Sequence, residues 1–114
     1  MPSQPLKIAL AQINFRVGDI NANVNRITEA AVLARDELGA DLILFPELIV
    51  TGYPAEDLLF RPDFITAANN AVYQLAGQVN DIALVVGFPE QDDGKLYNSA
   101  AMLHHGAILA CYRK

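Results

Sequence analysis

The chain has 114 residues, the length of one domain, and 53% of them are hydrophobic while 18% are charged. This composition allows a substantial core and excludes a chain that is disordered as a whole. The formal net charge is -5 and the 8 Lys and Arg residues form no cluster, so a nucleic-acid backbone is a poor partner. The single cysteine excludes an intrachain disulfide, and no apolar run has the length of a signal peptide or a membrane span. We therefore expect a cytoplasmic protein that makes no membrane contact.

The first part of the chain predicts a strand, a helix and a second strand. Residues Lys7–Asn14 are typical of a strand. The next apolar residues recur at alternating steps of three and four, which is the spacing of one helix face. They are Val24, Ile27, Ala31, Ala34 and Leu38. Asp19 or Asn21 can cap the start of this helix, and Gly39 suits its end. The continuous apolar run Leu42–Phe45 then predicts the second strand.

The middle of the chain repeats this alternation. Pro62 and Asp63 are typical of a helix start. The apolar face that follows comprises Phe64, Ala68, Val72, Leu75 and Val79. Residues Ile82–Val86, ending at Gly87, predict a third strand. Strands that alternate with helices indicate a parallel α/β sheet, and continuous apolar strands indicate that both sheet faces are covered.

The last part of the chain predicts a β-hairpin. Residues Leu96–Leu103 and Ala107–Tyr112 are typical of two antiparallel strands that are joined near the turn at 105–106. We assign residues 1–114 to one α/β domain. Because Lys114 follows directly after an apolar strand, we expect these residues to be the first portion of a larger domain, and a short native terminus is the alternative.

Glu47 is the most informative candidate for chemistry, because it follows the buried strand Leu42–Phe45 after a single proline. Open α/β sheets gather their functional groups at the carboxyl ends of their strands. A carboxylate that is buried at such a place could act as a general base near neutral pH. A carboxylate at the start of a helix, favoured by the helix dipole, is the alternative. The sequence alone leaves both interpretations open.

Two further residues could join Glu47 in a site. Lys114 could meet this carboxylate if the last strand docks beside the strand that ends at Phe45, and its ammonium group could then stabilise a developing oxyanion. A solvated lysine at a strand end is the alternative. Tyr53 follows a glycine turn close to Glu47, and either lines a pocket or packs on the surface.

The last two strands contain other polar groups. Asn98 and Ser99 either hold a neighbouring loop by hydrogen bonds or are ordinary strand polarity. In a regular strand Cys111 points away from Lys114, so we expect it to be a small buried hydrophobic residue rather than a nucleophile. The adjacent histidines at 104–105 face opposite sides of an extended strand, so they cannot chelate one metal ion together.

Three segments together resemble the nitrilase, or carbon–nitrogen hydrolase, superfamily. They are Ile8-Ala9-Leu10-Ala11-Gln12 with Gly18-Asp19 and Asn25, Leu44-Phe45-Pro46-Glu47-Leu48 with Thr51-Gly52-Tyr53, and Tyr97-Asn98-Ser99-Ala100 with the strand into Tyr112-Arg113-Lys114. Their order and spacing match across essentially all 114 residues. Within the superfamily, residues 51–62 (TGYPAEDLLFRP) resemble the amidase domain of the glutamine-dependent NAD synthetase family.

The resemblance implies a fold and a catalytic set. The fold is an α-β-β-α sandwich of four layers, of which this chain would form a part with the order β-α-β-α-β and then a β-hairpin. Such a part leaves sheet surface and strand edges uncovered, which favours aggregation. The catalytic set is Glu, Lys and Cys, in which Glu47 matches the general base and Lys114 the oxyanion-stabilising lysine. The nucleophilic cysteine would lie beyond Lys114, and Cys111 does not match it, so the 114 residues alone would be inactive.

The resemblance also implies a function. The domain would hydrolyse glutamine and pass ammonia to a C-terminal synthetase domain, which converts nicotinate adenine dinucleotide to NAD with ATP and Mg. The segment itself would hold no cofactor, and the full-length ligase would be a homo-oligomer. Two other functions stay open, a stand-alone nitrilase-superfamily amidase or carbamoylase and a non-catalytic α/β binding module. The stretch 52–62 favours the synthetase over the stand-alone hydrolase.

Overall fold

The computed structural model describes residues 5–12, 15–52 and 56–113. Its elements, in chain order, are β1 (Ile8–Leu10), α1 (Ile20–Leu38), β2 (Leu42–Leu44), the short 3-10 helix η1 (Glu56–Phe60), α2 (Pro62–Gln78), β3 (Ala83–Asp92), β4 (Lys95–His104) and β5 (Ala107–Arg113). Within these described residues the strands form one sheet in the order β1-β2-β3-β4-β5. The pairs β1-β2 and β2-β3 are parallel, and β3-β4 and β4-β5 are antiparallel. The predicted β-α-β-α-β order with a final hairpin is confirmed.

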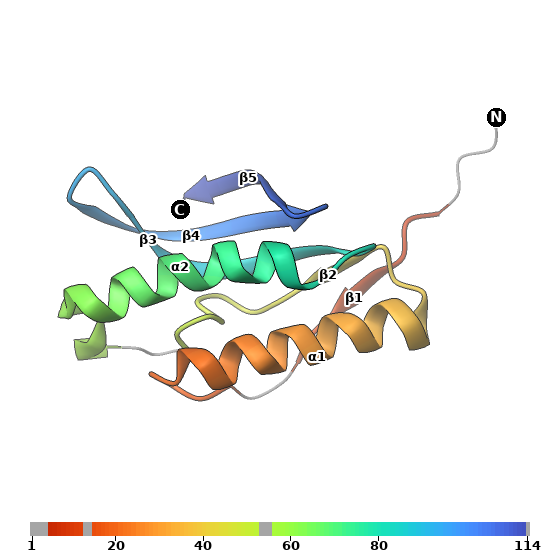
Figure 1. Ribbon diagram of the computed structural model, residues 1–114, viewed down its shortest axis with the longest axis horizontal. Helices are drawn as coiled ribbons and strands as arrows, with labels where there is room; N and C mark the ends of the chain where they lie inside the picture. The colour runs from red at the N-terminus through yellow and green to blue at the C-terminus, as the bar shows by residue number, and fades with distance from the viewer. Residues whose placement is uncertain (1–4, 13–14, 53–55, 114) are drawn as a thin grey trace.

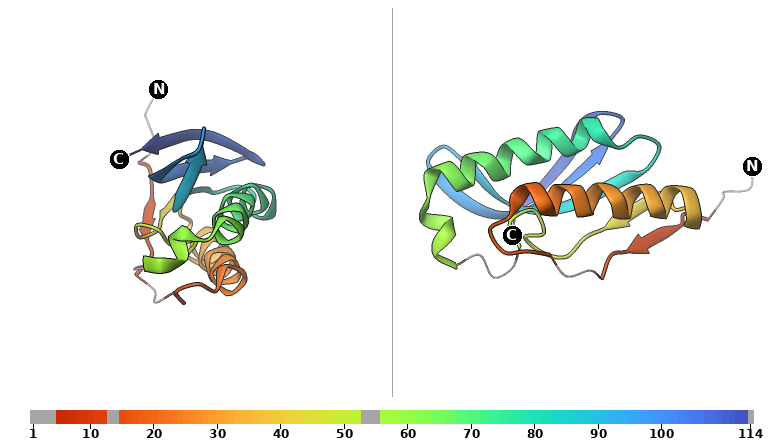
Figure 2. Two further views of the ribbon diagram at one scale, coloured as in Figure 1. Left: turned by 90° about the vertical axis from the view of Figure 1, so that its left-hand side faces the viewer. Right: turned by 60° about the horizontal axis from the view of Figure 1, so that its bottom comes forward.

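Both helices pack on one face of the sheet and leave the other face open (Figure 1, Figure 2). Strand side chains alternate between faces, so the pairing register assigns each row of neighbours to one face. The row toward the helices is Ala9, Ile43, Leu84, Leu103 and Ile108. The row on the open face is Leu10, Leu44, Val85, Met102 and Ala110. Ile43 and Leu84 are buried, whereas Leu10 is 67% exposed. The described chain therefore consists of one helix layer and one sheet layer.

Helix α1 is fixed by caps at both ends. The Asp19 side chain accepts a hydrogen bond from the Ala22 backbone N–H at 3.1 Å, which confirms the first of the two predicted N-caps. Gly39 has a left-handed φ of 63°, and the Ala40 N–H donates back to the Ala34 carbonyl at 2.9 Å. This turn folds Ala40 into the core, and Leu38 is left 61% exposed. The prediction that Leu38 lies on the buried face is therefore wrong.

Helix α2 begins with Pro62 at its first turn, as predicted. Its buried face is Ile65, Ala68, Ala71, Val72, Leu75 and Ala76, and Phe64 is only partly buried. The two helices lie side by side on the sheet and contact each other (Figure 2). The core comprises buried residues of both helices and of the sheet.

The strands differ from their predicted lengths because pairing partners set them. β1 and β2 pair over three residues each, which is shorter than the predicted Lys7–Asn14 and Leu42–Phe45. β3 continues from Ala83 to Asp92, well beyond the predicted end at Gly87, because β4 pairs with it along its whole length. Both hairpin turns, at 93–94 and 105–106, have two consecutive residues with positive φ, which is the geometry of two-residue hairpins.

Candidate active site

Glu47 starts a tight loop, residues 47–52, two residues after the end of β2 at Leu44. The four residues after it, 48–51, are buried, while Glu47 itself is exposed. Leu48 has a positive φ of 53°, which turns its side chain into the protein and leaves the carboxylate outside. The sequence left open whether Glu47 is buried, and among the described residues it is exposed. The loop is nevertheless anchored on both sides of the carboxylate by its buried neighbours.

Gly87 of β3 makes the close approach of this loop possible. A Cβ atom at Gly87 would lie only 2.6 Å from the Leu48 backbone nitrogen and 3.3 Å from the Glu47 Cα. A glycine inside a strand is therefore required where the loop crosses the open face of the sheet. The Val50 N–H donates to the Gly87 carbonyl at 3.2 Å, and the Phe45 N–H donates to the Val85 carbonyl at 3.1 Å. β3 thus fixes the chain before and after Glu47.

A second support comes from Asn23 on the buried side of α1. Its side-chain amide donates to the carbonyls of Val50 at 3.1 Å and Arg16 at 2.7 Å, and its Oδ1 accepts from the Arg16 N–H at 2.9 Å. The Gly18 N–H also donates to the Thr51 carbonyl at 2.8 Å. Asn23 is fully buried with its hydrogen bonds satisfied, so it fixes the loop against α1.

Asn98 of β4 contacts the Glu47 carboxylate directly. Its Nδ2 group donates a hydrogen bond to Glu47 Oε1. The register places Asn98 and Ala100 on the open face, on either side of Ser99, which faces the helices. Of the two interpretations of Asn98, the structure supports the one in which it holds a neighbouring loop.

A small pocket of about 130 Å³ surrounds this contact. It lies between Phe45, Glu47, Val85, Gly87, Asn98 and Ala100. A carboxylate that is oriented by an amide donor in an apolar hollow can accept and return a proton at a fixed place. The chemistry that this arrangement offers is general base and general acid catalysis.

The other two predicted site residues, Lys114 and Tyr53, lie outside the described residues. The last strand does not dock beside the strand that leads to Phe45, which was the condition set for a contact between Lys114 and Glu47, because β3 and β4 lie between β2 and β5. The last described residue of β5, Arg113, pairs with Ser99. The end of β5 is thus next to the β4 residue that follows Asn98, rather than next to β2.

Cys111 is exposed, so the expectation of a buried hydrophobic residue is wrong. It pairs with Ala101 and therefore points to the helix side, at the edge strand. Partial desolvation, followed by the negative charge of Glu90, raises the pKa of the Cys111 thiol. A thiol with a raised pKa is a poor nucleophile, and this one lies on the opposite face of the sheet from Glu47.

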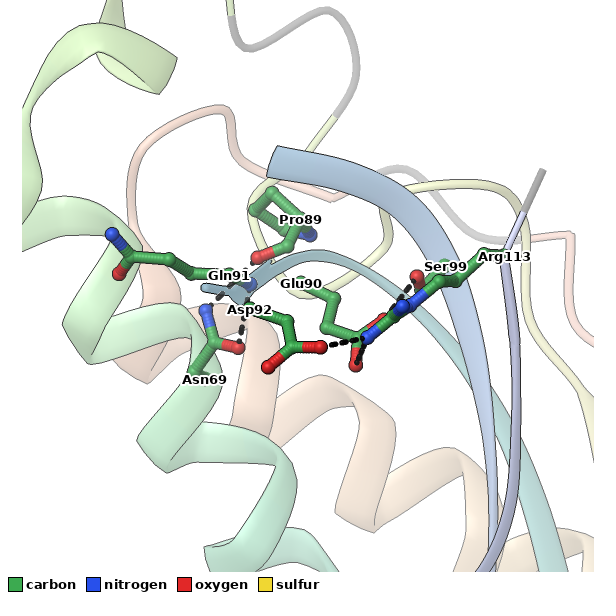
Figure 3. A network of polar contacts seen from close by, with 7 residues as sticks. All are labelled: Asn69, Pro89, Glu90, Gln91, Asp92, Ser99 and Arg113. Carbon is green, nitrogen blue, oxygen red and sulfur yellow. Dashed lines mark hydrogen bonds and ion pairs between the residues drawn. The ribbon is translucent and has the colours of Figure 1, made fainter. Parts of the chain in front are cut away.

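A polar cluster joins β3, β4 and β5 on the helix side (Figure 3). The Glu90 carboxylate accepts hydrogen bonds from Ser99 Oγ at 2.8 Å, Arg113 Nε at 2.8 Å and Arg113 Nη2 at 3.1 Å. Arg113 Nη2 also donates to Asp92 at 2.7 Å. The hydrogen bonds from Arg113, more than any other cause, lower the pKa of Glu90.

The sequence interpretation missed three residues that shape these two regions. Gly87 was read as a strand end, although a glycine within an apolar strand signals a close backbone approach. Asn23 was overlooked, although a polar residue on the buried side of a helix signals a buried hydrogen bond. Glu90 left no local signal, because its partner Arg113 is 23 residues away in the chain.

No group of three or more His, Cys, Asp or Glu side chains within the described part of the chain could hold a metal ion. None of its helices combines the length and the apolar character needed to cross a membrane.

The chain is similar to known carbon–nitrogen hydrolases. Residues 7–114 match the protein family described as carbon-nitrogen hydrolase. A glutamine-dependent NAD(+) synthetase from Xanthomonas campestris pv. campestris is 46% identical over 109 residues, which are 96% of this chain and 20% of that relative. The structure of a glutamine-dependent NAD+ synthetase from Acinetobacter baumannii with ADP has a TM-score of 0.89 and 43% identity, over 96% of this chain and 20% of that one.

A smaller relative has also been solved. A mutant of the amidase from Nesterenkonia sp. AN1, which shows the result of Michael addition of acrylamide at the active site cysteine, has a TM-score of 0.81 and 31% identity. The match covers 96% of this chain and 44% of that amidase. The chain thus spans about one fifth of the length of the synthetases and less than half of the amidase.

Proposed function

Because the chain belongs to the carbon-nitrogen hydrolase family, we propose that it carries the general base of an amidase site that releases ammonia from glutamine for NAD synthesis. The observation that carries the proposal is the Glu47 carboxylate, oriented by Asn98 at the carboxyl end of β2. The similarity to glutamine-dependent NAD synthetases over 96% of the chain supports glutamine as the amide.

The proposed reaction has two halves, formation of a thioester and its hydrolysis, and Glu47 accepts and returns one proton in each. A cysteine thiol attacks the side-chain amide carbon of glutamine, a carbon–sulfur bond forms, and the thiol proton passes to Glu47. Glu47 returns this proton to the amide nitrogen as the carbon–nitrogen bond breaks and ammonia leaves. It then accepts a proton from the water that attacks the thioester, and gives it back to the sulfur as glutamate is released.

The remaining roles come from resemblance. Lys114 would stabilise the oxyanion of the tetrahedral intermediates, and Tyr53 would line the glutamine pocket. The nucleophile would come from outside these 114 residues. Cys111 does not suit the role, because it points to the helix side while Glu47 lies on the open face.

The proposal extends to groups that this chain does not carry. The ammonia would be used by a C-terminal synthetase domain that binds ATP and Mg and converts nicotinate adenine dinucleotide to NAD. We propose that the whole protein is a homo-oligomer that works in the cytoplasm, where the one cysteine of this chain would stay reduced.

The substitution Glu47→Gln in the full-length protein tests the proposal. It keeps the size of the side chain but removes the base, so NAD formation with glutamine as nitrogen donor should be abolished. NAD formation with added ammonia should stay close to that of the wild type. The control Glu37→Gln, on the exposed side of α1, should change neither rate. Glutamine use that survives Glu47→Gln would show that the role is wrong.

A second candidate function is a stand-alone amidase that acts on another amide. The similarity to the Nesterenkonia amidase favours it, because the same fold segment occurs there in a shorter protein. Rates of ammonia release from glutamine and from small aliphatic amides separate the two candidates. A clear preference for the small amides, without any ATP-dependent NAD formation, would support the amidase.

A further inference from the structure

We infer that Glu90 and Arg113 form a clamp that positions the end of β5, and through it the catalytic residue that follows this strand. The inference rests on the proposed function, because it assigns a positioning role within the same amidase site. Arg113 is the residue directly before Lys114, to which the resemblance assigns the oxyanion-stabilising role.

The clamp adds a polar side-chain tie to three strands that also meet through backbone pairing and the apolar core. Glu90 belongs to β3 and Arg113 to β5, and β4 lies between them. The Glu90 carboxylate accepts from Arg113 Nε at 2.8 Å and Nη2 at 3.1 Å, and from Ser99 Oγ of β4 at 2.8 Å. Two parallel N–H donors on one carboxylate define the direction of the guanidinium group as well as its distance. Figure 3 shows this convergence at the end of the hairpin.

Two further contacts fix the Arg113 guanidinium group. Its Nη2 donates to Asp92 at 2.7 Å, and the guanidinium carbon lies 4.2 Å from the centroid of the Tyr97 ring. The Glu90 side chain is only 19% exposed and that of Arg113 39% exposed. An ion pair that is partly buried and held by several hydrogen bonds holds its geometry better than an ordinary surface pair.

Backbone pairing holds β5 from one side only. It is the last strand of the described sheet and pairs with β4. A register shift between Met102 and Leu103 lies near the turn, whereas residues 110–113 pair regularly with 99–102, and most residues of β5 are exposed. An edge strand lacks a second neighbour, so a side-chain tie at Arg113 adds a constraint that the backbone pairing does not supply.

The dipeptide Asn98-Ser99 of β4 connects the clamp to the base. Successive strand residues point to opposite faces, so Asn98 binds Glu47 on the open face while Ser99 binds Glu90 on the helix side. One short segment of β4 therefore contacts both the Glu47 carboxylate and the clamp at the end of β5. This arrangement would hold a base and a cation in one fixed relation, as catalysis requires.

The test compares clamp variants with matched controls in the full-length protein. The clamp variants are Glu90→Gln and Arg113→Lys, and Lys cannot reproduce the bidentate contact of Arg. The controls are Glu37→Gln and Arg35→Lys, since Arg35 also binds a carboxylate, that of Asp36 at 2.8 Å, but on α1 away from β5. The measurements are kcat and KM for ammonia release from glutamine, and hydrogen exchange of the segment 107–113.

The clamp predicts a specific pattern. Both clamp variants should lower kcat by about ten-fold or more with KM within about two-fold, because misplacing a catalytic group by a fraction of an ångström costs rate rather than binding. Exchange of 107–113 should become faster, while the controls keep the wild-type kcat and exchange.

Three results would overturn the positioning role, the clamp or the proposed function. Wild-type kcat in the clamp variants of an active protein overturns the positioning role, even if exchange of 107–113 is faster. Unchanged exchange of 107–113 overturns the clamp itself. A wild-type protein that releases no ammonia from glutamine overturns the proposed function, and with it the catalytic role of the clamp. Faster exchange in the variants then still supports the mechanical tie between β3 and β5.

Discussion

The Asn98 side-chain amide orients the Glu47 carboxylate by a hydrogen bond. Asn98 reaches it from β4, and both residues line the small pocket on the open face. A carboxylate that loses its donor keeps its charge but not its direction, and catalytic geometry tolerates little error. The polar side chain in mid-strand therefore belongs to the site rather than to general strand polarity.

Replacement of Asn98 by Ala should therefore lower kcat for ammonia release from glutamine by about ten- to a hundred-fold, with a small change in KM. Steady-state kinetics of the full-length protein measure both constants. Asn70→Ala, a matched substitution on the exposed side of α2, should leave both constants unchanged. A rise in KM at constant kcat would instead assign Asn98 to substrate binding.

The ion pair of Glu90 makes stability depend on pH with a definite sign. Arg113 lowers the pKa of Glu90 in the folded protein below its ordinary value of 4.5. A lowered pKa means that the pair stabilises the fold above the ordinary value, and that this contribution disappears as the pH falls through the folded-state pKa. Glu90→Gln should therefore lower the thermal midpoint at about pH 7 and lower it much less at about pH 3. A difference between the two proteins that does not change with pH would contradict this assignment.

The loop 47–52 can pack against β3 only because Gly87 has no side chain. Gly87 has no Cβ, and this lets the Leu48 backbone nitrogen pass close to β3. An added Cβ at Gly87 would lie only 2.6 Å from that nitrogen. Asn23 and the Gly87 carbonyl then hold Val50 from two sides. The position of Glu47 is thus decided by β3 and α1, neither of which touches its carboxylate through the contacts described above.

Gly87→Ala should consequently push the loop away from β3 and destabilise the protein by about 1–3 kcal/mol, since the added Cβ meets backbone rather than a flexible side chain. Denaturant unfolding of the full-length protein measures the loss. Gly77→Ala is the control, because nothing lies within 4 Å of its added Cβ within α2. That variant should gain about 0.5–1 kcal/mol from helix propensity. Equal stabilities of the two variants would mean that the loop does not need the glycine.

Local patterns predicted the elements well where local chemistry decides them. The cap at Asp19, the turn at Gly39 and the start of α2 at Pro62 each depend on neighbours within one helical turn. Strand lengths were less predictable, because β3 extends to Asp92 only through pairing with β4. The contacts of Glu47 and Glu90 were not predictable from local pattern, since their partners are 51 and 23 residues away.

For the candidate site too, local features were predictable from the sequence and long-range contacts were not. The position of Glu47 after a buried strand follows from the run Leu42–Phe45 and the following proline. Its exposure does not follow, because it results from the positive φ of Leu48 and the close approach to Gly87. Strand alternation predicted that Cys111 points away from Lys114, which lies outside the described residues, and the register places Cys111 on the helix side. Its exposure goes with its place on the edge strand β5, which the local pattern did not show.

At the scale of the whole molecule, the helices cover one face of the sheet and the other face is open. The helices bury one side of the sheet, while the other side presents apolar side chains that include Leu10 at 67% and Tyr112 at 69% exposure. An α/β sheet with continuous apolar strands is normally covered on both sides. In the isolated 114 residues this face exposes apolar side chains of neighbouring strands to water.

The isolated 114-residue chain should therefore self-associate through its open face as its concentration rises. Analytical ultracentrifugation measures the association, and the double variant Leu10→Glu/Tyr112→Glu should weaken it, because association would then bury unpaired carboxylates. Leu33→Glu is the matched control, since Leu33 is similarly exposed, at 57%, but lies on α1 on the other side of the molecule. If Leu33→Glu weakens the association as much as the double variant does, the contact involves the helices. If the chain stays monomeric at every concentration, the open face does not drive association.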